Sequence, residues 1–92
     1  MFSEEDIKFR IINKLLKWRK WGGSHTENIL GGLPSHLKGE KITKKVIDEL
    51  VKSQWLFAML KTKEIHYSLN TNKKAEIEGF IKNYIEKHKP TE

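Results

Sequence analysis

The chain has 92 residues, and 18 lysines and arginines against 12 aspartates and glutamates give it a formal net charge of +6. It contains no cysteine, which excludes disulfides, thiolate nucleophiles and thiolate-bound metal sites. A chain of this length is expected to form one domain with a modest hydrophobic core. Its positive charge favours polyanionic partners, such as nucleic acid or an acidic membrane surface.

Nothing in the sequence is suited to crossing a membrane. The longest apolar run, at residues 55–60, is far shorter than the about 20 residues that a spanning helix needs. The N-terminus is acidic and lacks the basic flank and apolar stretch of a leader segment. We therefore expect a soluble cytoplasmic protein.

A first helix is predicted to begin after Ser3 and to end at Trp21. Ser3 and Asp6 have the spacing of a capping box, and the pair Gly22–Gly23 stops the helix. Lysines such as Lys8 are expected to face water. The apolar stripe predicted for the buried side consists of Ile7, Ile11, Leu15 and Trp18, with Ile12 and Leu16 beside it.

A short second helix is predicted at residues 24–30, where Ser24 and Glu27 form another capping box. A turn containing Pro34 follows. The third helix, at about residues 39–53, has one buried face built from Ile42, Val46, Ile47, Leu50 and Val51.

The remaining third of the chain predicts a β-hairpin and a last helix. Residues 55–60 and 64–69 read as strands joined by a loop at residues 61–63, with Ile65, Tyr67 and Leu69 on one face. Residues 70–72 offer N-caps for a helix that extends to about residue 85, followed by a charged tail at residues 86–92.

The order helix, short helix, turn, basic helix, hairpin, helix resembles the winged helix-turn-helix family. The resemblance covers about residues 4–85. The segments Trp21–Gly22, His25–Thr26, 32–37 and 66–70 look like a group of small archaeal winged-helix proteins with no assigned activity. The chain departs from these patterns at Gln54, where the third helix often ends in glycine, and at Thr71, where the archaeal group has proline.

The resemblance implies an α+β, mostly helical fold: a single winged helix-turn-helix domain with three helices, a β-hairpin wing and a C-terminal helix. In this family the third helix enters the major groove of double-stranded DNA. We therefore expect a small transcriptional regulator that binds double-stranded DNA.

Lysines are the candidate DNA-contacting groups. A helical wheel places Lys38, Lys41, Lys45 and Lys52 opposite the buried face of the third helix, with Lys44 at the margin and Asp48 among them. At the hairpin tip, Lys61 and Lys63 flank Thr62, an arrangement suited to phosphate contacts. A solvated basic face and a bare polar turn are the plainer interpretations of these two groups.

Lys20, His25 and His36, near the second helix, are further candidates for phosphate contacts, and ordinary helix capping or a local hydrogen bond is the plainer interpretation. The four histidines are 11, 30 and 22 residues apart, which matches no metal-binding spacing. No metal site, no cofactor and no catalysis are therefore expected, because the chain also lacks nucleophile and phosphate-loop motifs.

The aromatic residues are expected mainly in the core, with Trp21 as the least accounted for and a candidate for stacking on single-stranded RNA. The last helix either covers the core or pairs with its copy in a homodimer through Ile77, Phe80, Ile81 and Tyr84. A protein-interaction module remains the alternative to DNA binding, together with RNA binding, since a fold does not fix a function.

Overall fold

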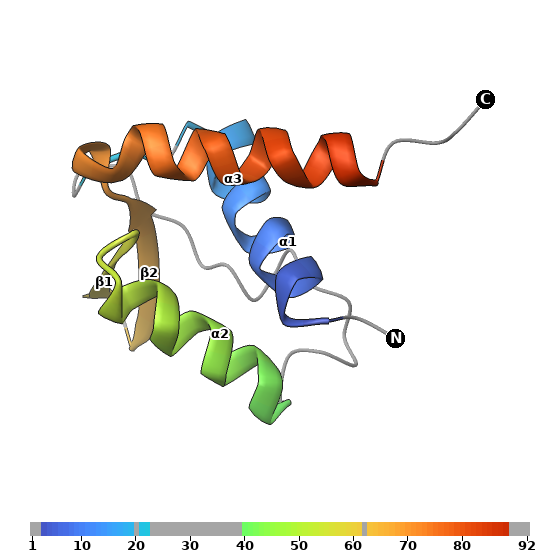
Figure 1. Ribbon diagram of the computed structural model, residues 1–92. Coiled ribbons are helices and arrows are strands. Elements are labelled where there is room, and N and C mark those ends of the chain that lie inside the picture. Colours follow the sequence, from blue (N-terminus) through green and yellow to red (C-terminus); the bar gives the residue numbers. More distant parts are fainter. Residues whose placement is uncertain (1–2, 20, 23–39, 62, 89–92) are drawn as a thin grey trace.

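The computed structural model describes residues 3–19, 21–22, 40–61 and 63–88. Within these residues, the chain forms α1 (Glu4–Lys17), α2 (Lys41–Lys52), the antiparallel strands β1 (Leu56–Lys61) and β2 (Glu64–Leu69), and α3 (Lys74–Lys87). Helix α3 runs across the top of Figure 1, with α1 beneath it and α2 below. This arrangement confirms the predicted α+β, mostly helical class. The helix predicted at residues 24–30 lies outside the described residues.

Helix α1 begins as its sequence predicts. The Ser3 side chain accepts a hydrogen bond from the Asp6 backbone N–H, and the Asp6 carboxylate accepts one from the Ser3 N–H. Three acidic residues occupy its first turn, where they complement the positive end of the helix dipole. The side chains buried by this helix are Ile7, Ile11, Ile12 and Leu15.

The predicted end of α1 is wrong by four residues. The helix stops at Lys17 because Arg19 adopts a left-handed φ of 54°, and Trp18 at the C-cap is 62% exposed instead of buried in the stripe. The reversed chain brings Trp21 beside β2, where it forms a parallel bridge with Leu69. The adjacent Gly22 N–H donates to the Leu69 carbonyl at 3.0 Å, so the segment after α1 is tied to the hairpin.

Helix α2 ends in a tight hydrogen-bonded cap. The Trp55 N–H donates to the Leu50 carbonyl and the Gln54 N–H to the Val51 carbonyl, both at 3.0 Å. These two bonds define a Schellman motif, in which the residue after the C-cap takes a left-handed conformation. Gln54 is that residue and has φ of 66°, although glycine adopts this conformation more readily. Asn70 holds the same turn, because its side chain donates to the Gln54 carbonyl at 2.7 Å.

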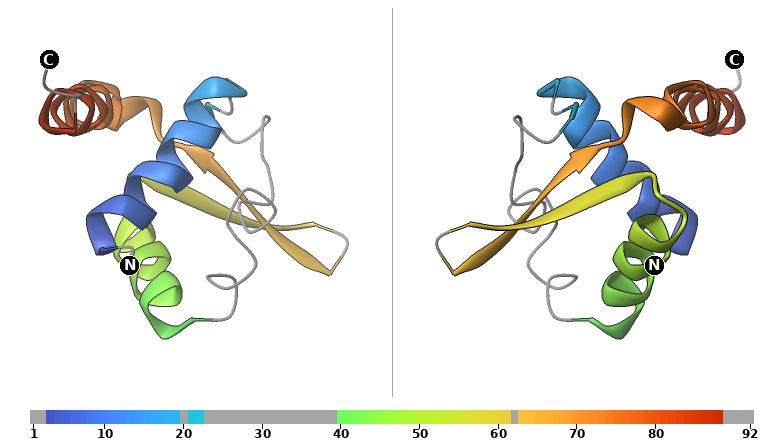
Figure 2. Two further views of the ribbon diagram at one scale, coloured as in Figure 1. Left: turned by 90° about the vertical axis from the view of Figure 1, so that its right-hand side faces the viewer. Right: turned by 90° about the vertical axis from the view of Figure 1, so that its left-hand side faces the viewer.

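The hairpin is buried at its base and exposed at its tip. Leu56 pairs with Leu69 at the base, and Leu60 pairs with Ile65 near the tip. This register confirms that Ile65 shares a face with Tyr67 and Leu69. The two base leucines are at most 1% exposed, whereas Leu60 is 77% and Ile65 51% exposed. Burial falls along the strands because the hairpin projects beyond the helices, as both views of Figure 2 show.

A short 3-10 turn, Thr71–Lys73, leads into α3, and Asn70 caps it by accepting from the Asn72 N–H. Helix α3 runs to Lys87, two residues past its predicted end. Ile77 from α3 is fully buried in the core that α1, α2 and the hairpin base share. Tyr84 stacks on Phe9 of α1 with ring centroids 4.0 Å apart, and Phe80 meets Trp55 edge-on. These contacts place α3 over the core.

Candidate nucleic-acid interface

The outer face of α2 carries the predicted lysines. Thr43, Val46, Ile47 and Leu50 turn inward and are buried, which leaves the opposite side of the helix in solvent. Four of the predicted lysines lie exposed on this helix: Lys41, Lys44, Lys45 and Lys52. Together with Asp48 and Glu49 they line a shallow surface groove of about 410 Å³. The structure therefore brings these four lysines together on one helix.

The N-terminal end of α2 has an unusual charge distribution. No acidic residue lies in its first turn, and the N-cap residue Glu40 makes no side-chain hydrogen bond to the helix. Lys41 is instead the first helical residue, followed by Lys44 and Lys45. The positive end of the helix dipole and three positive side chains thus coincide, an arrangement that disfavours the isolated helix and attracts anions.

One of these lysines has a partner within the domain. The Lys45 Nζ lies 3.5 Å from the Glu4 Oε1, and both side chains are about half exposed or more. Such an exposed ion pair is worth less than about 1 kcal/mol, so a phosphate could displace the carboxylate at little cost. Asp48 and Glu49, by contrast, repel phosphates from the C-terminal half of the same face.

The hairpin tip presents two more lysines and an apolar surface. Lys61 and Lys63 are exposed, and Lys63 has a left-handed φ of 68° at the turn. Lys61 is the last residue of β1 and pairs with Glu64, so the strand reaches into the predicted loop. The hairpin also exposes large apolar side chains whose exposure does not follow from the alternation of its sequence, namely Phe57, Met59, Leu60 and Ile65.

Some predicted phosphate-contacting residues lie outside the described part of the chain: Lys20, His25, His36, Lys38 and Thr62. Two histidines are described. His66 lies 3.4 Å from the Glu64 carboxylate, and the His88 ring stacks on Tyr84. Among the described residues, no group of three histidine or acidic side chains is placed to hold a metal ion.

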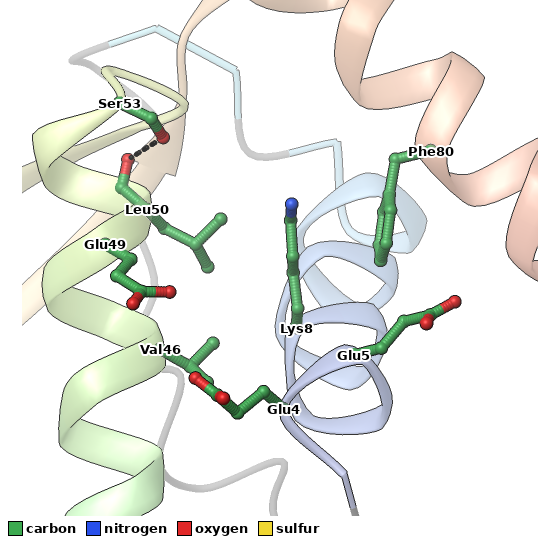
Figure 3. Close-up of a pocket in the computed structure, with 8 residues that line it drawn as sticks. All are labelled: Glu4, Glu5, Lys8, Val46, Glu49, Leu50, Ser53 and Phe80. Carbon is green, nitrogen blue, oxygen red and sulfur yellow. Dashed lines mark hydrogen bonds between the residues drawn. The ribbon is translucent and has the colours of Figure 1, made fainter.

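A second surface feature lies between the three helices. A cavity of about 550 Å³ is lined by residues from α1, α2 and α3, with Ser53 just after α2 (Figure 3). Lys8 stands between Leu50 and Phe80 in this cavity, with Glu4, Glu5 and Glu49 around it. Glu5 forms an ion pair with Lys87, whose Nζ lies 3.3 Å from the Glu5 Oε2.

The sequence predicts that Lys8 faces water, but in the structure Lys8 is half-buried. Its Nζ lies 4.2 Å from the centroid of the Trp55 ring and 4.6 Å from that of Phe80. Burial lowers the pKa of Lys8, while the negative charges of Glu49 and Glu5 act in the opposite direction. A cation over two aromatic faces is stabilised by about 1 kcal/mol or more, so Lys8 joins α1 to the Trp55–Phe80 pair. Helical periodicity could not reveal this contact, because both rings come from distant segments.

Trp21, the proposed stacking platform, is half-buried. The Lys74 Nζ lies 6.0 Å from the centroid of the Trp21 ring and forms a cation–π contact with it.

Within the ranges that the structure describes, no helix has the length and apolar character needed to cross a membrane. Comparison of the chain with family models, with curated proteins and with solved structures finds no match.

Proposed function

We propose that this chain is a winged helix-turn-helix domain that binds double-stranded DNA and acts as a small transcriptional regulator. Helix α2 would enter the major groove, with the hairpin as the wing. The observation that carries this proposal is the coincidence of three lysines with the positive end of α2. The order of α2, hairpin and α3 supports the family assignment.

The contrast between α1 and α2 supports a binding role for the lysines. Helix α1 has Glu4, Glu5 and Asp6 in its first turn and a complete capping box, as expected where selection favours helix stability. Helix α2 has lysines and no side-chain cap at the same place. Phosphates bound there would complement both the lysines and the positive end of the helix dipole.

The chemistry of the surface sets the expected specificity. Lys41, Lys44 and Lys45 provide point charges, which suit phosphates but not the bidentate recognition of guanine that arginine provides. Lys61 and Lys63 would hold the flanking backbone. The domain should therefore bind duplexes of different sequence with similar affinity, and its affinity should fall steeply as the salt concentration rises.

Fluorescence anisotropy of a labelled mixed-sequence duplex tests the proposal. The variant Lys41→Glu/Lys44→Glu is suited to this test because acidic residues in the first turn should stabilise α2. We expect it to fold as well as wild type and to bind at least about tenfold more weakly at low salt, since two phosphate contacts are lost. Circular dichroism and a thermal unfolding curve confirm that the fold is intact.

The matched control is Lys17→Glu/Lys87→Glu, which makes the same change in net charge at the C-terminal ends of α1 and α3. It should retain most of the affinity. Equal losses in both variants would show that only the net charge matters, and absence of duplex binding by wild type at low salt would refute the proposal. Preferential binding of single-stranded RNA, with loss of affinity in Trp21→Ala, would favour the RNA alternative.

A protein-interaction module is the second candidate, because the hairpin exposes Leu60 and Ile65 side by side. Here the hairpin and not α2 would be the binding surface. Leu60→Gln/Ile65→Gln should then abolish capture of a partner protein, while Lys41→Glu/Lys44→Glu should not. Unchanged capture by the hairpin variant would exclude this surface.

A further inference from the structure

The outward side of α3 carries a regular row of alternating charges. Four residues spaced by four along the helix form this row, and all are exposed: Lys74, Glu78, Lys82 and Glu86. None of the four takes part in an ion pair with another described residue. Lys74 makes a cation–π contact, with its Nζ 6.0 Å from the centroid of the Trp21 ring. We call this set the charged row.

The charged row is distinct from the side of α3 that packs on the domain. Ile77 is fully buried, and Phe80, Ile81 and Tyr84 are half-buried against their own chain. These are the residues through which the sequence analysis expected a dimer. Since they contact α1 and the core of the same protomer, a dimer built on α3 would have to use a different part of the helix.

A groove runs along the charged row, and Glu78, Lys82 and Glu86 of the row line it together with three apolar side chains. It has a volume of about 410 Å³, and its apolar walls are Leu16 of α1 with Ile81 and Ile85 of α3. Ile85 is 49% exposed. Two small residues, Ala75 and Gly79, lie near the N-terminal part of the row, and a Cβ atom built at Gly79 would meet no atom within 4 Å. The outward side of α3 therefore combines one exposed isoleucine, Ile85, with room for side chains of a partner.

We propose that α3 docks antiparallel against α3 of a second copy of this chain. Charge complementarity identifies a second α3 helix as the partner and sets its antiparallel orientation. In an antiparallel pair centred near Phe80, Lys74 faces Glu86 of the partner subunit and Lys82 faces Glu78 of the partner subunit, each twice by symmetry. In a parallel pair the same row would place lysine against lysine and glutamate against glutamate, which is repulsive.

The same alignment matches a large side chain with a small one. Ile85 comes opposite Ala75 of the partner subunit. A small residue opposite a large one lets two helices approach closely and covers the exposed Ile85. The i, i+4 spacing of the charged row also forms the ridge by which helices most often pack.

The size of the contact predicts a weak dimer. A helix of 14 residues is about 21 Å long, so one helix pair buries less than the roughly 800 Å² per partner of a standard interface. We expect a dissociation constant of the dimer of about 10 to 500 µM at low salt. Because its ion pairs are solvent-exposed, the dimer should weaken as the salt concentration rises.

Sedimentation equilibrium with a complementary pair of variants tests this proposal. Glu78→Lys/Glu86→Lys makes the row entirely positive, and Lys74→Glu/Lys82→Glu makes it entirely negative. Each variant alone should be monomeric at concentrations where wild type is dimeric, because like charges then face each other. An equimolar mixture should restore dimers, since only the mixed pair is complementary. Glu40→Lys/Glu76→Lys, which raises the net charge as much as Glu78→Lys/Glu86→Lys but outside the row, should dimerise nearly as well as wild type.

A second variant separates docking from helix stability. Ala75→Leu should leave the stability of α3 nearly unchanged, because alanine and leucine are both good helix formers, and yet weaken association at least about tenfold by filling the space opposite Ile85 of the partner subunit. Circular dichroism shows that each variant is folded. The proposal is overturned if wild type stays monomeric up to about 1 mM, if the single-sign variants dimerise as well as the control, or if their mixture stays monomeric.

Discussion

The hydrogen bond between Tyr84 and Asp6 joins α3 to the start of α1 and offers a direct test of the structure. The Tyr84 hydroxyl donates to the Asp6 Oδ1 at 2.5 Å, and the other carboxylate oxygen accepts from the Ser3 N–H. The hydrogen bond from Tyr84, followed by the bonds from Ser3, lowers the pKa of Asp6 from 3.8 to about 2. Tyr84→Phe removes this donor and keeps the ring that stacks on Phe9.

The magnitude follows from the pKa of Asp6. At about 1.4 kcal/mol per pKa unit the full difference would be about 2.5 kcal/mol, but Tyr84 supplies only part of it and both side chains are partly exposed to solvent. We therefore expect Tyr84→Phe to lower the free energy of unfolding by about 1 kcal/mol at neutral pH. The Asp6 pKa is depressed in the folded state, so this contribution is present above pH 3.8 and is lost as the pH falls through about 2.

At alkaline pH the stability from this hydrogen bond is lost as the pH rises, which is the opposite direction from the acid side. The hydrogen bond to Asp6, followed by burial, raises the pKa of Tyr84 to about 12. The resulting stability is complete below pH 10 and disappears as the pH rises through about 12. The cost of Tyr84→Phe should consequently be constant between about pH 5 and pH 9.

Urea unfolding at pH 7 and near pH 2 measures these differences, and NMR titration of the Asp6 carboxyl gives its pKa directly. Tyr67→Phe is the matched control, since Tyr67 and Tyr84 are the two tyrosines of the chain. We expect the Asp6 pKa to rise by about one unit in Tyr84→Phe and not in Tyr67→Phe. An equal loss of stability at both pH values, or an unchanged Asp6 pKa, would refute the argument.

Three further substitutions test the core and the turns by chemical or thermal unfolding. Gln54→Gly should stabilise the domain by about 0.5–1 kcal/mol, because φ of 66° suits glycine and the Schellman hydrogen bonds use backbone atoms only; a loss of stability would contradict this account of the turn. Ser68→Ala should leave stability unchanged or raise it by up to about 1 kcal/mol, since the buried Ser68 Oγ has no hydrogen-bond partner in the described part of the chain, and a clear loss would reveal one. Ile11→Ala should cost about 2–4 kcal/mol because Ile11 is 1% exposed in the shared core, whereas a cost below about 1 kcal/mol would place it outside the core.

The sequence predicted the local features that depend on neighbouring residues. The capping box at Ser3 and Asp6, the buried face of α2 and a hairpin of two strands follow from local spacing, although the first strand was predicted at residues 55–60 and lies at residues 56–61. The outward direction of Lys41, Lys44 and Lys45 follows in the same way, because a buried stripe leaves the opposite side of a helix in solvent.

The features that the sequence left open depend on contacts between distant segments. Periodicity placed Trp18 in the core, but the left-handed Arg19 turns the chain so that Trp21, not Trp18, meets β2. Periodicity placed Lys8 on the water-facing side of α1, but the rings of Trp55 and Phe80 lie over its ammonium group. The alternation of the hairpin placed Ile65 and Leu69 on one face, but only the tertiary structure leaves Ile65 51% exposed while it buries Leu69 completely.

The sequence alone determined the order and type of the described helices and strands and most of the apolar side of each helix, because these depend on spacing along the chain, whereas the end of α1 and the position of Trp18 did not follow from it. The tertiary structure decided which apolar and charged sides remain exposed. It turned Ile77 and Tyr84 inward against α1 and the core, and it left the charged row of α3 and the lysine-rich end of α2 in solvent. The physical reason is that a side chain is covered by whatever segment packs on it, and packing joins residues as far apart as Asp6 and Tyr84.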